Sequence, residues 1–256
     1  MIHVKIDGRL GNQMFQYAVC RAVAKRREYN FSFPLKGDEY IINDEGHHLT
    51  DYFDVDTGVR DAPILGVYWE NWDTLGYDEA IFSVADFSLL VGFFQSERYF
   101  EGIEDEVRSW FRPKYETKAG AFLSERDPED HCFIHFRGGD YRGKDGWILG
   151  MPYFRAAMSA VESARPGVRF VVVTDDVPLA SEMFGNIECV RNDMMTDFEI
   201  LKSAKQRIIS NSTFSWWASW LAGDSLTVAP DRWINHNRPG SGFFPADIRT
   251  EKFLYV

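Results

Sequence analysis

The sequence is poor in cysteine and has no long apolar run. Its three cysteines, Cys20, Cys132 and Cys189, are widely spaced, and each has apolar neighbours. This pattern excludes a disulfide framework and favours buried free thiols in a reducing compartment. The N-terminus lacks the apolar core of a signal peptide, and no stretch is long enough to span a bilayer. We therefore expect a cytoplasmic protein without a transmembrane segment, and peripheral attachment to a membrane stays open.

The sequence also has few basic residues. The 256 residues include 28 Lys and Arg against 39 Asp and Glu, which gives a formal net charge of −11. This balance argues against nucleic acid as a partner, because phosphate-backbone binding needs a broad basic face. An anionic small molecule can still bind where a few arginines converge.

The second half of the chain alternates strands and helices, which indicates a parallel sheet with right-handed crossovers. We expect helices near 116–126, from Pro152 to 164, from Pro178, and at 198–204 and 214–222, and strands near 131–136, 168–174, 187–190, 207–209 and 226–229.

The first half begins with a predicted strand at 2–6, a glycine-bearing loop, and a helix at 14–27. Such a loop either presents a helix N-terminus to an anion or only makes a tight turn. A strand at 89–94 follows later, and then a helix that Ser96 caps and that ends before Pro113. We expect a boundary near residue 113, between an N-terminal half (1–112) and a C-terminal half (113–256).

Three predicted strands of the second half end in polar residues. These are the segments 137–140, 175–176 and 211–215. The carboxyl ends of parallel strands share one edge of a sheet, where open α/β folds bind ligands. Arg137 suits phosphate oxygens, and Gly138 and Gly139 leave the backbone open to a ligand. The segments therefore predict a nucleotide diphosphate site.

Each of these residues also has a purely structural interpretation. Arg137 can form a salt bridge to Asp140. One of Asp175 and Asp176 is expected to cap a helix, and the hydroxyls at 212 and 213 can do the same.

Two further groups of residues allow alternatives. The pair His47 and His48 invites a metal site, but no other ligand has suitable spacing, so a surface loop is favoured. The aromatic residues at 69, 72 and 77, with Asp73 and Asp78, form either an acceptor-sugar surface or half-buried loop packing.

Four motifs resemble those of the family 11 glycosyltransferases, the α-1,2-fucosyltransferases. They are GRLGNQMFQYA at 8–18, HFRGGDY at 135–141, VTDD at 173–176 and IISNSTFSWW at 208–217. The stretches QSERYF at 95–100 and Ala229-Pro230 with Trp233 are also similar to that family. The motifs occur in the family's order and extend to about residue 233, so the combination is specific.

The resemblance implies an α/β fold of the GT-B type, with two Rossmann-like domains whose parallel sheets face a central cleft. The domain 1–112 would lie on the acceptor side, and the domain 113–256 would bind the nucleotide-sugar. It implies inverting transfer of L-fucose from GDP-β-L-fucose to a glycan hydroxyl, such as O2 of a galactose-type sugar, without a metal or other cofactor. Arg137 would neutralise the departing diphosphate. The implied catalytic residues are Arg137 and Asp140, and the implied donor-binding residues are Gly11, Asn12, His135, Arg137, Asp175, Asp176, Asn211, Ser212 and Thr213.

The chain departs from the family pattern in two places. Gly138 replaces a second arginine, and Gln206 replaces a histidine, with Arg207 beside it either restoring the charge or pointing away. These departures leave open another donor, such as an activated rhamnose, and a catalytically silent sugar- or nucleotide-binding protein. A dehydrogenase is disfavoured because the first loop lacks GxGxxG.

The general base has three candidates without ranking. They are Asp7, Asp73 and Asp140, and Asp140 can instead hold its own loop.

Overall fold

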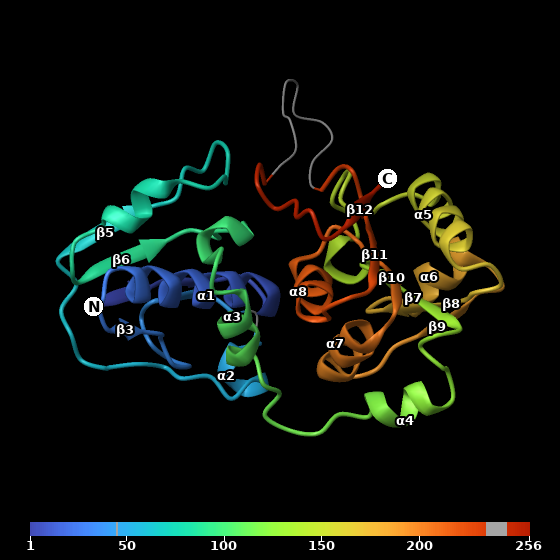
Figure 1. Ribbon diagram of the computed structural model, residues 1–256, viewed down its shortest axis with the longest axis horizontal. Coiled ribbons are helices and arrows are strands. Elements are labelled where there is room, and N and C mark those ends of the chain that lie inside the picture. Colours follow the sequence, from blue (N-terminus) through green and yellow to red (C-terminus); the bar gives the residue numbers. More distant parts are fainter. Residues whose placement is uncertain (45, 234–244) are drawn as a thin grey trace. The chain divides into compact units, whose positions relative to one another are not determined.

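The computed structural model describes residues 1–44, 46–233 and 245–256, and the chain divides into two compact units (Figure 1). The first unit contains residues 1–115 together with 245–250, and the second contains 116–233 together with 251–256. The boundary lies three residues beyond the predicted one. The segment 245–250 groups with the first unit because Ala246 N donates to Thr74 O at 3.1 Å and Tyr77 N to Asp247 Oδ2 at 2.7 Å.

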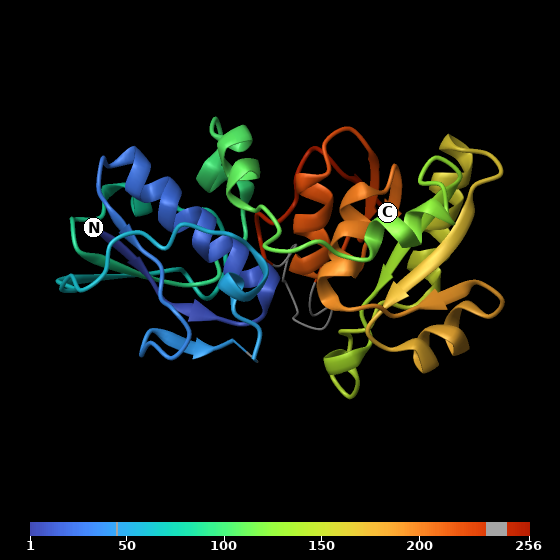
Figure 2. The ribbon, with the colours of Figure 1, turned by 90° about the horizontal axis from the view of Figure 1, so that it is seen from below.

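The first unit contains a four-stranded parallel sheet with the order β3-β1-β6-β5. Its strands are β1 (Ile2–Val4), β3 (Phe31–Ser32), β5 (Gly66–Trp69) and β6 (Ser88–Val91). A second small sheet pairs β2 (Ile6–Asp7) with β4 (Ile41–Asn43). Helix α1 (Leu10–Arg26) runs alongside these strands (Figure 1 and Figure 2) and is buried over most of its length.

Helix α1 begins four residues earlier than the sequence predicts. Asn12 N and Gln13 N both donate to Arg9 O, so these polar residues form the first helical turn. Gln13 and Gln16 are fully buried, yet both amides are hydrogen bonded. Because these residues are polar, the spacing of apolar residues in the sequence does not indicate that the helix begins before Met14.

The remaining helices of this unit are short: α2 (Leu49–Tyr52), α3 (Glu104–Trp110) and the 3₁₀ turns η1 (Glu79–Ser83) and η2 (Glu97–Phe100). The single helix predicted after Ser96 is therefore wrong. Gly102, with φ of +82°, separates η2 from α3, because that conformation breaks a right-handed helix. The predicted cap is confirmed, since Arg98 N donates to Ser96 Oγ at 3.3 Å.

The second unit contains a six-stranded parallel sheet with the order β12-β11-β10-β7-β8-β9. Its strands are β7 (His131–Phe136), β8 (Arg169–Thr174), β9 (Glu188–Val190), β10 (Gln206–Ile208), β11 (Leu226–Ala229) and β12 (Leu254–Tyr255). The helices are α4 (Ala119–Ser124), α5 (Met151–Ala164), α6 (Val177–Phe184), α7 (Met194–Ser203) and α8 (Thr213–Leu221), with the turn η3 (Gly139–Tyr141). Strands β8 and β9 extend from β7 in one direction, and β10 to β12 extend in the other. The chain reverses between β7 and β10, which makes that edge a topological switch point.

Both faces of this sheet are covered. Helices α5 and α6 pack on one face and α7 and α8 on the other (Figure 1). Residues of β7 alternate between them, with Phe136 against Phe154 of α5 and His135 against Phe214 of α8. This double coverage explains why β7 is buried at every position.

Most predicted elements of the second half are confirmed, with two differences. Helix α7 begins at Met194, where Asp193 accepts from Thr196 N at 3.0 Å, and not at residue 198. Strand β12 has only two residues and was not predicted. Among the described residues, no helix combines the length and apolar character that a bilayer crossing requires.

Candidate functional site

The polar ends of β10, β7 and β8 lie side by side, because these three strands are neighbours in the sheet. Ser210 joins two of them, since its hydroxyl accepts from Arg137 N at 3.1 Å and donates to His135 O at 2.8 Å. Asp175 follows β8 and contacts the same loop. The sheet thus brings the three predicted segments together at its switch point.

Arg137 lies at this edge between two carboxylates. Its Nη2 lies 2.6 Å from Asp140 Oδ1, and its Nη1 lies 2.6 Å from Asp175 Oδ2. The side chain keeps 15% of its surface exposed, and its guanidinium also lies 5.5 Å from the centre of the Tyr141 ring. The salt bridge to Asp140 is therefore present, and Asp175 is a second anchor.

Asp175 also holds the glycine backbone. Its Oδ1 accepts from Gly138 N at 2.9 Å and from Gly139 N at 3.0 Å. A Cβ at position 139 would lie 2.6 Å from Asp175 Oδ2. The open space that the sequence suggested for a ligand is occupied here by a carboxylate of the same chain.

Asp176 has a different partner and a capping role. Its Oδ1 accepts from Leu179 N at 3.2 Å, so it is the predicted N-cap, in this case of α6. Arg142 binds the same carboxylate through two nitrogens, with Nη2 2.8 Å from Oδ1 and Nε donating to Oδ2. Hydrogen bonding to Arg142 lowers the pKa of Asp176.

The end of β10 supports the loop 142–150. Tyr141 Oη donates to Asn211 O at 3.0 Å, and Asn211 Nδ2 donates to Trp147 O at 3.0 Å. Ser212 precedes α8 at the N-cap position, but its side chain makes no capping hydrogen bond. The interpretation of the Ser212 hydroxyl as a helix cap is therefore wrong. Its hydroxyl, beside the first turn of α8 and Thr213, is free of this role.

His135 is buried in the sheet, with its ring 5.6 Å from that of Phe214. Burial, and then the charge of Arg137, lower its pKa to about 3. The lowered pKa favours the neutral imidazole. Contact of His135 with a donor stays a prediction.

Arg207 does not reach the strand end. It is fully buried and donates to Thr227 Oγ1 at 3.2 Å, to Ser219 O at 3.4 Å and to Ala204 O. Of the two possibilities that the sequence left open, the side chain points away. Burial lowers its pKa to about 10.

In the first unit, the motif at 8–18 fixes its own loop. Gln95 Nε2 donates to Asn12 Oδ1 at 2.9 Å, and Gln16 Nε2 donates to Gly92 O at 3.0 Å. Gly8 has a φ of +86°, and a Cβ there would lie 2.5 Å from Asn12 Nδ2. Gly11 is buried in the first turn of α1. The loop after β2 and the loop after β6 are thereby joined at one edge of the unit.

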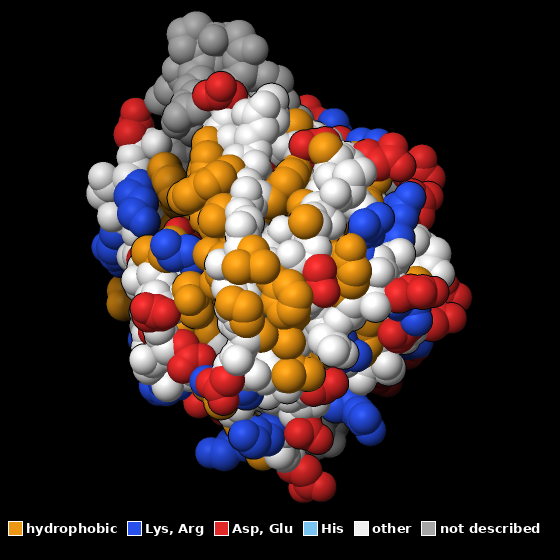
Figure 3. Space-filling view, turned by 90° about the vertical axis from the view of Figure 1, so that its left-hand side faces the viewer, with side chains coloured by type: hydrophobic (Ala, Val, Ile, Leu, Met, Phe, Trp, Pro, Cys, Tyr) orange, Lys and Arg blue, Asp and Glu red, His pale blue; other side chains and the backbone are white. Residues whose placement is uncertain are grey.

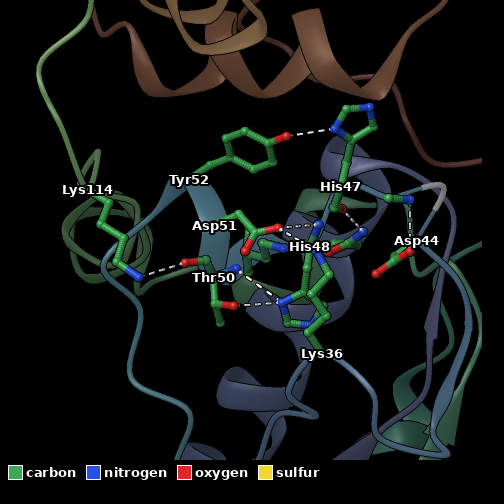
Figure 4. A network of polar contacts seen from close by, with 11 residues as sticks. Lys36, Asp44, His47, His48, Thr50, Asp51, Tyr52 and Lys114 are labelled. Carbon is green, nitrogen blue, oxygen red and sulfur yellow. Dashed lines mark hydrogen bonds and ion pairs between the residues drawn. The ribbon is translucent and has the colours of Figure 1, made fainter.

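Gln13 of the same motif bonds the backbone on either side of His48. Figure 4 shows the two histidines with Thr50 and Tyr52. Its Nε2 donates to His47 O at 2.6 Å, and its Oε1 accepts from Leu49 N at 2.8 Å. His47 Nδ1 lies 2.6 Å from Tyr52 Oη, whereas His48 is fully buried and caps α2. The surface-loop interpretation is therefore wrong for His48. Within residues 1–44, 46–233 and 245–256, no group of three or more His, Cys, Asp or Glu side chains is arranged to hold a metal.

Glu70 was missed by the sequence analysis. It follows β5, is 2% exposed, and accepts from Phe93 N at 2.7 Å and Phe94 N at 2.9 Å. Burial raises its pKa to about 7. An acid directly after an apolar strand was the available signal. Its role is to hold the loop that carries Gln95 against the end of β5.

The aromatic residues at the end of β5 and in the segment after it divide between the two proposed roles. Trp69 is 61% exposed and Trp72 is 46% exposed, whereas Tyr77 packs between Tyr99 and Arg98. Figure 3 views the molecule from the side on which β5 lies in Figure 1 and shows hydrophobic side chains gathered on that face. Packing thus accounts for Tyr77 and in part for Trp72, whose ring centre lies 5.5 Å from that of Phe93 in an edge-to-face contact. It leaves Trp69 unexplained.

Comparison with known proteins places the chain in a family. The model of glycosyl transferase family 11 matches residues 1–244. An α-1,2-colitosyltransferase of Escherichia coli is 26% identical over 290 aligned positions, which cover 98% of this chain and 99% of that protein. The galactoside α-(1,2)-fucosyltransferase 1 of Plecturocebus brunneus is 25% identical over 93% of this chain and 72% of its own length.

Solved structures give the fold. The structure of NodZ α-1,6-fucosyltransferase soaked with GDP-fucose aligns with a TM-score of 0.55 at 12% identity, covering 86% of this chain and 92% of that one. POFUT1 in complex with GDP aligns with a TM-score of 0.50 at 13% identity, covering 88% and 95%. The predicted GT-B-like α/β fold class is confirmed.

Proposed function

The chain belongs to glycosyl transferase family 11, and we propose that it transfers L-fucose from GDP-β-L-fucose to a glycan hydroxyl, O2 of a galactose-type sugar. We propose further that transfer inverts the anomeric centre and needs no metal. The observation that supports this most strongly is the position of Arg137 at the switch point of the second unit, fixed by Ser210 and Asp175.

The chemistry of such a transfer assigns Arg137 its role. As the bond from the anomeric carbon to the diphosphate oxygen breaks, negative charge grows on the leaving GDP. A guanidinium that is already oriented stabilises that charge without reorganisation. Asp140 and Asp175 supply the orientation, since each lies 2.6 Å from a different terminal nitrogen of Arg137.

The remaining donor contacts come from the neighbouring strand ends. Ser212, whose side chain makes no capping hydrogen bond, offers a hydroxyl to phosphate or ribose, and the first turn of α8 offers backbone amides. Asn12 is proposed as a donor contact of the first unit, held by Gln95. We propose that this unit also carries the acceptor side.

A second donor is favoured by one observation. The relative that covers 98% of this chain is a colitosyltransferase. Colitose differs from L-fucose by the absence of one ring hydroxyl, so the same cleavage of a diphosphate ester serves both sugars. A nucleotide-activated colitose is therefore the alternative donor.

The test is a transfer assay with purified protein. We expect GDP release from GDP-fucose to rise with a galactoside acceptor, to yield an α-1,2-linked product, and to persist in excess EDTA. Parallel reactions with GDP-colitose rank the two donors by kcat/KM. If the acceptor stimulates turnover of neither GDP-fucose nor GDP-colitose, the proposal is refuted. Binding of a donor without turnover would indicate a silent binding protein.

A further inference from the structure

A charge imbalance around Arg137 points to a second cation. Its two ion-pair partners, Asp140 and Asp175, outweigh its single positive charge. A nucleoside diphosphate brings additional negative charge, so Arg137 alone would face it inside a net negative cluster. Binding needs further positive charge in the same loop.

The position beside Arg137 cannot provide it. A Cβ at Gly138 would lie 2.7 Å from Asp176 Cβ and 3.1 Å from Phe136 Cε1. Any side chain there would displace Asp176, which caps α6. The packing therefore excludes a cation at position 138.

Arg142 follows the short turn η3 and has the required properties. Its Nε and Nη2 both bind Asp176, which is only 8% exposed and is itself fixed by the amide of Leu179. The Arg142 side chain nevertheless keeps 54% of its surface exposed, against 15% for Arg137. Because a guanidinium has five N–H donors, those not used on Asp176 stay available for a ligand.

Lys144 restores the net charge balance, because the charge of Arg142 is offset by its own partner, Asp176. Lys144 Nζ lies 3.8 Å from Asp140 Oδ2 and 4.6 Å from the Trp147 ring centre. With these two side chains, three cations face the three carboxylates at 140, 175 and 176. Arg142 is the better anchored of the two, since it is held by two hydrogen bonds.

We infer that Arg142 is a phosphate-binding residue of the donor site, and that its remaining N–H donors supply the cationic contact which a side chain at Gly138 cannot. This inference rests on the proposed function, because it assumes that a nucleoside diphosphate binds at the ends of β7, β8 and β10. Asp176 then acts as the positioning residue that fixes the Arg142 guanidinium.

The experiment measures Kd by isothermal titration for GDP, GMP and guanosine with the full chain. The variants are Arg142→Ala, Arg142→Lys and Arg165→Ala. Arg165 is a matched control, because it is similarly exposed and pairs with Glu129 at 3.8 Å. Circular dichroism and melting temperature verify that each variant is folded.

We expect Arg142→Ala to weaken GDP binding about tenfold or more, in line with the loss of one charge-assisted contact. Guanosine binding should not change, and Arg142→Lys should retain part of the GDP affinity. Arg165→Ala should match the unmodified protein.

Two results would overturn the assignment. One is an unchanged Kd for GDP in folded Arg142→Ala, and the other is an equal loss for GDP and guanosine, which would mark a contact to the nucleoside. Both leave the proposed function intact. Failure of the unmodified protein to bind GDP would instead refute the donor proposal together with this inference.

Discussion

Arg137 and Asp175 form the central ion pair of the second unit, and the same carboxylate binds the two glycine amides that follow the arginine. Asp175 therefore fixes both the charge and the backbone of the loop after β7. A donor diphosphate that meets Arg137 competes with an anion of the protein itself. Removing either partner should have separate effects on binding and on folding.

The first prediction concerns Arg137→Ala. We expect GDP affinity to fall by about a hundredfold or more, because the cation at the switch point is lost. The free energy of unfolding should fall by about 1–3 kcal/mol, since Asp140 and Asp175 lose their shared partner. Chemical denaturation and titration with GDP measure the two effects. Arg137→Lys keeps the charge without the planar fork, so its GDP affinity should lie between that of the unmodified protein and that of Arg137→Ala. Full GDP affinity in Arg137→Ala would contradict a donor site at Arg137.

The second prediction concerns the glycines of this loop. We expect Gly138→Ala to cost about 1–3 kcal/mol of stability, because the added methyl meets Asp176 at 2.7 Å. Gly120→Ala in α4 is the control, since no atom lies within 4 Å of a Cβ there and alanine favours the helix. Urea unfolding compares the two. Equal stability of both variants would show that the loop has room at position 138.

These glycines illustrate what the sequence could and could not predict. The order of elements in the second half was predictable, because β-branched runs such as 168–174 alternate with helical stretches. The meeting of three polar strand ends followed from the parallel sheet alone. The partners of the glycine amides did not follow, since the side-chain direction of Asp175 depends on packing that no spacing encodes.

The first unit was harder to predict for a related reason. Its motif residues Gln13 and Gln16 are buried polar side chains, and a pattern of apolar residues treats them as exposed. Their hydrogen bonds to backbone carbonyls of distant segments, such as Gly92 O, exist only in the folded chain. The sequence did not single out Glu70, because its burial under the loop after β6, and the raised pKa that burial causes, exist only in the folded chain.

The third prediction concerns pH and Glu70. Its folded pKa of about 7 exceeds the ordinary value of 4.5, so the folded state binds more protons than the unfolded state between these pH values. Stability should therefore fall as pH rises from about 4.5 to 7, by up to about 3 kcal/mol from this group. Asp197, whose pKa is also raised to about 7 by burial, adds a similar slope.

Unfolding free energies from pH 5 to 8 check this prediction. Glu70→Gln cannot ionise, so its slope should be smaller than that of the unmodified protein, and Asp197→Asn should remove the other part. Only the slopes are compared, because Glu70→Gln also disturbs the amide contacts of Phe93 and Phe94. Identical slopes in Glu70→Gln and the unmodified protein would contradict the raised pKa.

The fourth prediction concerns the exposed tryptophans. Trp69→Ala should change stability by no more than about 0.5 kcal/mol, because the Trp69 ring is 61% exposed. Trp72→Ala should lower stability more, because the Trp72 ring packs edge-to-face on Phe93. If the two rings stack on the acceptor sugar, each substitution should raise the acceptor KM several-fold and leave GDP affinity unchanged. Tyr77→Ala is the contrasting variant and should lower stability instead. Unchanged acceptor KM in both tryptophan variants would exclude the sugar surface.

The last prediction concerns the general base. Of the three candidates, Asp140 is paired with Arg137 and Lys144, and Asp73 lies in the turn after β5. Asp7 ends β2 beside the Gly8 loop, and burial raises its pKa, which suits a carboxylate that must take a proton. We expect Asp7→Asn to lower kcat by about 10²-fold or more, with GDP affinity unchanged. The acid limb of the pH–rate profile should also disappear. Asp73→Asn is the control and should keep its rate, so a normal kcat in Asp7→Asn with a reduced one in Asp73→Asn would reverse the assignment.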